Sequence, residues 1–233
     1  MDAGRRRRER RCGVTLTPVT GGRLHLFRSD DRRSPVERGR RLALQATSLA
    51  RLPRPVAGFW LRAMRRAQTE RDTWSIDVAC RPAELRILLD TLAGARRVAE
   101  IGTAAAWTTC CLTLSQAGRE VHSWDVEAHP ERERYLGLLS PADRARMHLH
   151  DRPGGLGPAD PPPVDAVFID SSHEYDETVS TFRSWEPAVE PGGIVAFHDW
   201  QDGAYPGVTE AVRDLGLEGE GRGHLFVWRK PGR

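Results

Sequence analysis

The sequence predicts an α/β protein that has a doubly wound, mostly parallel sheet and a helical N-terminal extension. From about residue 80, short apolar runs typical of strands alternate with segments of helical periodicity. Strands that alternate with helices at this spacing pair in parallel, because each helix returns the chain to the same edge of the sheet. The 233 residues, 39% of them hydrophobic, suffice for one substantial globular domain with an extension.

The expected elements follow from this alternation. Apolar runs predict strands at residues 98–101, 121–124, 147–149, 164–169, 194–197 and 224–228. Helical periodicity predicts helices at residues 85–92, 107–114, 131–139, 178–189 and 208–215. Glycine and proline predict a loop at 154–163 and a turn at 191–193. We expect this domain to span residues 81–233.

Two further segments precede this domain. Residues 1–34 combine arginine runs with few large apolar residues, so we expect a basic, disordered arm. Residues 35–80 have helical periodicity that is interrupted by Pro53 and Pro55, which predicts two helices with a break between them. This segment could cap an active site, form the contact of a homo-oligomer, or simply pack on the main domain.

The charge distribution is asymmetric. Residues 1–71 contain 19 Arg, no Lys and 6 acidic residues, so a basic arm precedes an acidic domain. Such an arm could bind an anionic partner or remain a solvated tail. The densest stretch, residues 5–11, has no aromatic side chains that could stack on bases. This favours the solvated tail, and a nucleic-acid partner stays open as the alternative.

The composition also bears on location. The N-terminus lacks the apolar stretch of a secretory signal, and no apolar run approaches the ~20 residues that cross a bilayer. The four cysteines form no C-x-x-C pair, which favours reduced thiols over a zinc site or disulfides. We therefore expect a cytoplasmic protein that does not contact a membrane.

The ends of the first two predicted strands suggest a nucleoside ligand. Gly102 and the small residues after it allow the backbone to approach a ligand, and the following helix start can bind a carboxylate. The spacing does not match G-x-G-x-x-G, because Ala104 and Trp107 stand at the second and third glycine positions. The second strand ends in Asp125, whose carboxylate can bind a ribose diol. Together these features favour a cofactor that contains adenosine.

Two later strands each end in an aspartate. Asp170 and Asp199 follow the runs at 164–169 and 194–197. If the two strands are neighbours, their carboxylates repel each other unless a proton or a cation lies between them. A divalent metal ion with oxygen ligands satisfies this requirement. The alternative is that one aspartate caps a helix and the other is solvated.

The quoted residues resemble a known family. The run at 98–108 resembles the E-x-G-x-x-x-G cofactor loop of class I S-adenosylmethionine (SAM)-dependent methyltransferases, with Ala106 in place of the last glycine. Residues from about 82 to 231 resemble bacterial small-molecule O-methyltransferases of the macrolide-sugar type and, more distantly, catechol O-methyltransferase. The resemblance implies a Rossmann-like fold and SAM as the cofactor.

The resemblance also implies roles for individual residues. Asp125 binds the ribose of SAM, Thr108 lies near its methionine carboxylate, and Asp151 is a candidate for the adenine side. The remaining residues expected to line the cofactor belong to the first loop: Glu100, Gly102 and Thr103.

For the metal, the resemblance matches Asp170 and Asp199 to the ligands of the related enzymes. His198 stands where those enzymes have an acidic or amide ligand. Imidazole is a poor ligand for magnesium and a better one for manganese, iron or zinc. We expect Mg or Mn as the metal, and the imidazole at His198 leaves three possibilities open: a different metal, a His198 that is no ligand, or a site without metal. His173 lies where the related enzymes have a general base, and an ordinary pKa of ~6.5 suits that role.

The expected activity is O-methylation of a hydroxylated small molecule in secondary metabolism. The acceptor could be a sugar, a polyketide-linked sugar or a phenol. Three alternatives remain at this point: an N-methyltransferase, a nucleic-acid methyltransferase, and a catalytically inactive module that only binds SAM.

Overall fold

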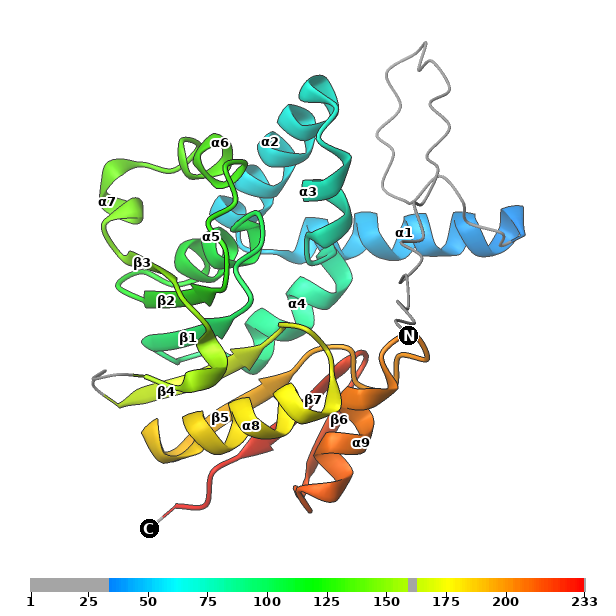
Figure 1. The fold of residues 1–233 in the computed structure, drawn as a ribbon. Helices are drawn as coiled ribbons and strands as arrows, with labels where there is room; N and C mark the ends of the chain where they lie inside the picture. Colours follow the sequence, from blue (N-terminus) through cyan, green and yellow to red (C-terminus); the bar gives the residue numbers. More distant parts are fainter. Residues whose placement is uncertain (1–33, 159–162, 233) are drawn as a thin grey trace, which may run out of the picture. The chain divides into compact units, whose positions relative to one another are not determined.

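The structure, a computed structural model, describes residues 34–158 and 163–232 (Figure 1). In this part of the chain a seven-stranded sheet has the order β3-β2-β1-β4-β5-β7-β6. The first five strands run parallel, and β7 is antiparallel to both β5 and β6. The predicted mostly parallel sheet is confirmed. The strands are β1 Arg97–Ile101, β2 Glu120–Asp125, β3 Met147–Asp151, β4 Val164–Ile169, β5 Val189–Phe197, β6 Gly219–Arg222 and β7 Leu225–Arg229.

Helices cover both faces of the sheet (Figure 1). On one side, α8 and α9 pack against each other and against a core of apolar strand residues that includes Ile101, Ile169 and Phe197. On the other side, α4 and α5 are in contact, and α4 also touches β7. The helices after residue 80 are α4 Pro82–Thr91, α5 Trp107–Ser115, α6 Arg132–Leu136, α7 Pro141–Arg144, α8 Tyr175–Trp185 and α9 Pro206–Asp214, with 3₁₀ turns at Gly154–Leu156 and Glu186–Ala188.

The segment before residue 80 forms three helices: α1 Pro35–Arg51, α2 Arg54–Glu70 and α3 Thr73–Val78. The helix α1 packs on α4, and α2 packs on α5. The contact of α2 is apolar, because its buried side chains include Phe59, Trp60 and Met64. The predicted break at the prolines is confirmed, and α3 is an additional helix. The predicted basic arm lies almost entirely outside the described residues.

Two expected elements differ in the structure. The helix predicted at 178–189 begins earlier, at Tyr175, and Val189 already belongs to β5. The turn predicted at 191–193 is instead part of β5, which pairs irregularly with β4 between Val164 and Ala166. Glycine tolerates this irregularity, because a side chain on Gly193 would meet the Asp165 carbonyl oxygen 2.8 Å away. In the described part of the chain, no helix is long and apolar enough to cross a membrane.

Candidate active site

The sheet order places the predicted site residues at one edge. In a parallel sheet, ligands bind at the carboxyl ends of the strands, where the strand order reverses. Here the order reverses between β1 and β4, which are neighbours. The loop after β1 and the aspartates after β4 and β5 therefore meet at the carboxyl edge. The loop after β1 and the backbone at Asp170 are in close contact, because a side chain at Gly102 would overlap the Asp170 carbonyl oxygen.

The loop after β1 has an unusual backbone. Gly102, Ala104 and Ala106 have φ angles of 106°, 43° and 64°, in the region that favours glycine. Ala106 precedes α5 and provides no side-chain cap for the first turn of that helix. A loop of small residues that leads into an uncapped helix start suits the approach of an anionic ligand group.

Glu100 is fully buried at the carboxyl end of β1. Its Oε2 accepts hydrogen bonds from the Ser123 hydroxyl, at 2.6 Å, and from the Thr109 hydroxyl. Its Oε1 has no partner among the described residues. Burial raises the pKa of Glu100 to about 8, against the lowering effect of the two hydroxyls. An unpartnered buried oxygen beside this loop fits a donor group from a cofactor.

Asp125, at the end of β2, holds the same loop. Its Oδ2 accepts a hydrogen bond from the Ala104 backbone N–H at 2.7 Å and lies 2.9 Å from an Nη of Arg132. Arg132 also donates to the Ala104 carbonyl oxygen and, at 2.8 Å, to Asp151 Oδ1. This buried guanidinium thus joins the first loop, Asp125 and Asp151. The sequence does not single out Arg132, because one arginine is inconspicuous in an arginine-rich chain.

The two predicted threonines lie near the same loop. The Thr103 hydroxyl is 2.7 Å from the Ser123 hydroxyl, which in turn bonds Glu100. Thr108 is buried in the first turn of α5. All predicted cofactor residues therefore lie at the carboxyl ends of β1, β2 and β3, in the loop after β1 or in the first turn of α5.

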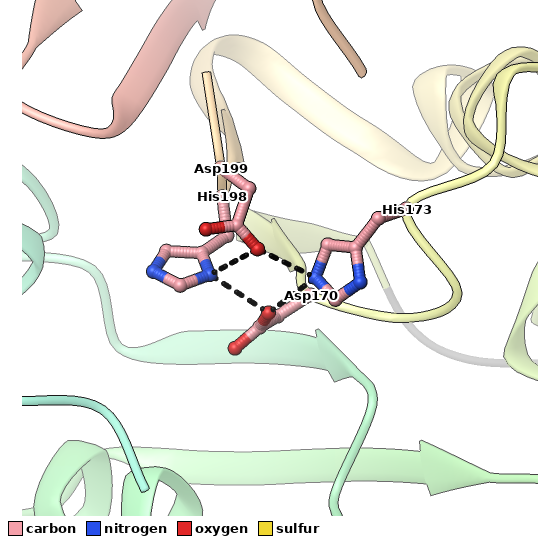
Figure 2. A group of neighbouring side chains, drawn as sticks. All are labelled: Asp170, His173, His198 and Asp199. Atoms are coloured by element: carbon pink, nitrogen blue, oxygen red, sulfur yellow. Dashed lines mark hydrogen bonds and ion pairs between the residues drawn. The ribbon is translucent and has the colours of Figure 1, made fainter. Parts of the chain in front are cut away.

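The predicted metal and base residues form one compact cluster of two aspartates and two histidines (Figure 2). His173 Nε2 lies 3.2 Å from Asp170 Oδ1 and 2.9 Å from Asp199 Oδ2. His198 Nδ1 lies 2.9 Å from the same Asp170 oxygen and 3.4 Å from the same Asp199 oxygen. Each imidazole therefore contacts both carboxylates. The residues of this cluster, which we call the Asp–His cluster, are Asp170, His173, His198 and Asp199.

The cluster is strongly coupled electrostatically. Burial alone would raise the pKa of Asp170, but His198 and His173 outweigh it and lower that pKa to about 2. Burial opposes protonation of His173, yet hydrogen bonds to Asp170 and Asp199 raise its pKa to about 9. The same two carboxylates raise the pKa of His198. Without a cation, two protonated imidazoles thus compensate the two carboxylates.

The backbone of the cluster is strained. His173 and Asp199 have φ angles of 63° and 55°, although neither is glycine. Such conformations cost of order 1 kcal/mol each and concentrate at functional sites. The Tyr205 ring lies against the His173 ring at a centroid distance of 4.4 Å and a tilt of 33°, and supports its position. The strain fits a set of side chains that is arranged for a ligand.

The cluster fits a divalent metal ion. One donor atom from each of the four residues lies within 4.8 Å of all the others. Ligand atoms that share one ion at about 2.1 Å lie about 3.0–3.4 Å apart. The distances of 2.9 and 3.4 Å from His198 Nδ1 to the Asp170 and Asp199 oxygens are close to this range. The His198 side chain is 13% exposed, and neither ring nitrogen has a hydrogen-bond partner of acceptable geometry among the described residues. An ion held by carboxylate oxygen and imidazole nitrogen would satisfy Nδ1.

Comparisons with known proteins bear on the fold and the family of the chain. A family model described as a methyltransferase domain matches residues 99–200, which include the first loop and the Asp–His cluster. No curated protein sequence matches the chain.

Solved structures share the fold. The structure of a Podospora anserina methyltransferase with bound S-adenosylhomocysteine is 13% identical, aligns over 86% of this chain and 98% of that chain, and has a TM-score of 0.59. The SAM-bound O-methyltransferase TomG of tomaymycin synthesis, from Streptomyces achromogenes, is 18% identical over 73% and 89% of the two chains, with a TM-score of 0.54. A TDP-rhamnose 3′-O-methyltransferase of calicheamicin biosynthesis is 17% identical over 85% and 96%, with a TM-score of 0.51.

The sheet and the matched family model indicate the class of this protein. Residues 99–200 match a methyltransferase domain, and the sheet has the fold of solved methyltransferase structures. The predicted Rossmann-like fold is confirmed, and the matched family model supports the predicted methyltransferase class.

Proposed function

We propose that this enzyme transfers the methyl group of SAM to a hydroxyl oxygen of a small molecule, with a divalent metal ion at the Asp–His cluster. The observation that supports this most strongly is the contact between the cofactor loop and the cluster. Gly102 packs on the Asp170 backbone, and the Asp170 N–H donates to the Ile101 carbonyl oxygen at 2.8 Å. A methyl donor on that loop and an acceptor at the cluster would therefore be neighbours.

The chain's residues have separate tasks in this proposal. The first loop, Asp125 and Arg132 fix the cofactor, so that its methyl group points to the acceptor. Asp170, Asp199 and His198 hold the ion. When bound, a divalent ion orients a hydroxyl and lowers its pKa. As the new C–O bond forms, the S–CH₃ bond breaks and leaves neutral S-adenosylhomocysteine.

We assign the hydroxyl proton to His173. Its Nε2 faces the two carboxylates, so its other ring nitrogen, Nδ1, is the atom that accepts the proton. Without a cation, a pKa of about 9 keeps this imidazole protonated at neutral pH and unable to act as a base. A cation at the carboxylates offsets the negative charge that raises the pKa of His173, so that pKa falls and the imidazole can accept a proton. The base therefore functions only when the metal is bound.

The similar structures support an oxygen acceptor on a small molecule. Two of them are described as O-methyltransferases, one involved in tomaymycin synthesis and one that acts on TDP-rhamnose. A sugar ring or a phenol with neighbouring hydroxyls would suit an ion that has open coordination positions.

A product screen tests the proposal. The enzyme is incubated with SAM that carries an isotope-labelled methyl group, Mg²⁺ or Mn²⁺, and a panel of sugars, nucleotide sugars, phenols, amines and RNA. Mass spectrometry should find the label on oxygen of a hydroxylated small molecule. Label on nitrogen or in RNA, with none on a hydroxyl, would contradict the proposal.

A further inference from the structure

His198 has neighbours beyond the Asp–His cluster. Cys80 and Glu84, just before and in the first turn of α4, also lie beside it. One donor atom from each of Cys80, Glu84 and His198 lies within 4.8 Å of the other two. His198, at the end of β5, thus lies between the Asp–His cluster and the start of α4. None of the roles described so far uses Glu84.

The two ring nitrogens of His198 have different surroundings. Nδ1 faces one oxygen each of Asp170 and Asp199, at 2.9 and 3.4 Å. Neither nitrogen has a hydrogen-bond partner of acceptable geometry among the described residues. A buried imidazole needs an acceptor for its N–H and a donor or metal for its lone pair. An ion beside the carboxylates would take the Nδ1 lone pair, and the Nε2 proton then needs an acceptor.

Glu84 can provide that acceptor. Its Oε2 accepts the Arg81 backbone N–H at 3.3 Å as part of the cap of α4, and the carboxylate has further acceptor capacity. Histidines that bind metals usually donate their other N–H to a carboxylate or carbonyl oxygen, which fixes the ring. Glu84 is the carboxylate outside the cluster that lies beside His198 in the described part of the chain.

We propose that His198 binds the metal through Nδ1, that Glu84 positions its ring, and that this nitrogen ligand makes the site prefer Mn²⁺, Fe²⁺ or Co²⁺ to Mg²⁺. The inference rests on the proposed function, since it needs an ion at the Asp–His cluster. It extends that function by naming the class of metal. Magnesium favours oxygen ligands and retains water, whereas imidazole suits first-row transition metals.

Direct metal binding to the full-length protein tests the inference without any methyl transfer. The protein is stripped of metal and loaded with Mn²⁺, and pulsed EPR detects the hyperfine coupling of a coordinated imidazole nitrogen. Calorimetry measures the affinities for Mn²⁺ and Mg²⁺. The variants are His198→Asp, which offers oxygen instead of nitrogen, and Glu84→Gln, which keeps an oxygen for the helix cap. The matched controls are His173→Gln and Glu210→Gln, an exposed glutamate of α9.

The wild type and His173→Gln should both show the nitrogen coupling, and His198→Asp should lose it. His198→Asp should also lower the ratio of Mn²⁺ to Mg²⁺ affinity by about tenfold or more. Glu84→Gln should keep the coupling but weaken Mn²⁺ binding by about 10- to 100-fold, the usual effect of losing an outer partner. Glu210→Gln should match the wild type.

Several results would overturn the inference. A nitrogen coupling that survives in His198→Asp and vanishes in His173→Gln would assign the ligand to His173. An unchanged ratio of Mn²⁺ to Mg²⁺ affinity in His198→Asp would show that His198 does not determine the metal preference. A Glu84→Gln variant that binds Mn²⁺ as tightly as the wild type would show that Glu84 does not position His198. A protein that binds no ion at all would refute this inference, whereas labelled product from such a protein would still support O-methylation.

Discussion

At the scale of single residues, burial and pairing determine what each ionisable group can do. Asp170 and Asp199 are kept charged by the two imidazoles, whereas Glu100 is kept neutral by burial. The sequence predicts Asp170 and Asp199 from their places at the ends of apolar strands, and the family resemblance adds Glu100, His173 and His198. It did not predict that both histidines contact both aspartates, since that depends on the left-handed backbone at His173 and Asp199.

Glu100 predicts a pH-dependent stability. Its pKa of about 8 lies above the unfolded value of about 4.3, so the folded state retains a proton that the unfolded chain loses. The contribution of this proton to the free energy of unfolding is therefore fully present below about pH 4. It is lost as the pH rises to 8, and the loss amounts to up to a few kcal/mol. Glu100→Gln cannot ionise, so its free energy of unfolding should fall less between pH 5 and 8. Urea unfolding at several pH values measures this, and a slope equal to that of the wild type and of Glu210→Gln would contradict it.

Asp125 predicts a change in SAM affinity. Asp125→Ala removes the proposed ribose contact and also the hydrogen bond that holds Ala104. Calorimetry should show SAM binding weakened by about 1–3 kcal/mol, roughly 5- to 150-fold. Asp151→Ala is the control, because Asp151 is more than half exposed and should matter less. Equal affinities for the wild type and Asp125→Ala would remove Asp125 from the cofactor site.

At the scale of elements, the periodicity of apolar residues located most of the fold. The run at 164–169 agrees with β4, because a strand buried on both faces is mostly apolar; Asp165 is its one charged residue and the one that is not fully buried. The strand β6 was missed, because Gly219–Arg222 is entirely exposed and has no apolar alternation. The sequence predicts a turn near the beginning of β5, because proline and glycine are typical of turns; here they permit a local irregularity within a paired strand.

The loop before α5 predicts a stabilising substitution. Ala106 has a φ of 64°, which is unfavourable for alanine by roughly 1 kcal/mol and free of this penalty for glycine. Ala106→Gly should therefore raise the free energy of unfolding or leave it unchanged, despite the added freedom of the unfolded chain. The neighbouring Ala105→Gly has no such strain to relieve and should be destabilising. Urea unfolding that shows equal destabilisation in both variants would contradict the strain at Ala106.

At the scale of the whole molecule, the sequence predicted the division into a basic arm, a helical segment and a catalytic domain. The described core lies within residues 34–232. The first helix has its own cap, because the Ser34 hydroxyl accepts the Glu37 N–H at 3.3 Å and the Glu37 carboxylate accepts the Ser34 N–H at 2.8 Å. Whether residues 35–80 also cap the acceptor or join two copies of the chain stays a prediction.

This division predicts the effect of a truncation. A protein that starts at Ser34 should have the unfolding free energy of the full chain and retain methyl transfer, because the cap of α1 and every described site residue remain. Circular dichroism and the labelled-methyl assay measure the two properties. A truncated protein that folds normally but no longer turns over would place the basic arm in the substrate contact and favour a nucleic-acid acceptor.

The most direct test of the account is the turnover rate of the wild type, on the acceptor found in the screen, after exhaustive chelation and after metal is added back. If the Asp–His cluster holds the ion that activates the hydroxyl, chelation should lower the rate by roughly 10²-fold or more, since both the ion and an unprotonated His173 are lost. Adding Mn²⁺ should restore it. A chelated enzyme that runs at the full rate would contradict the role of the metal and leave the cluster without its proposed function.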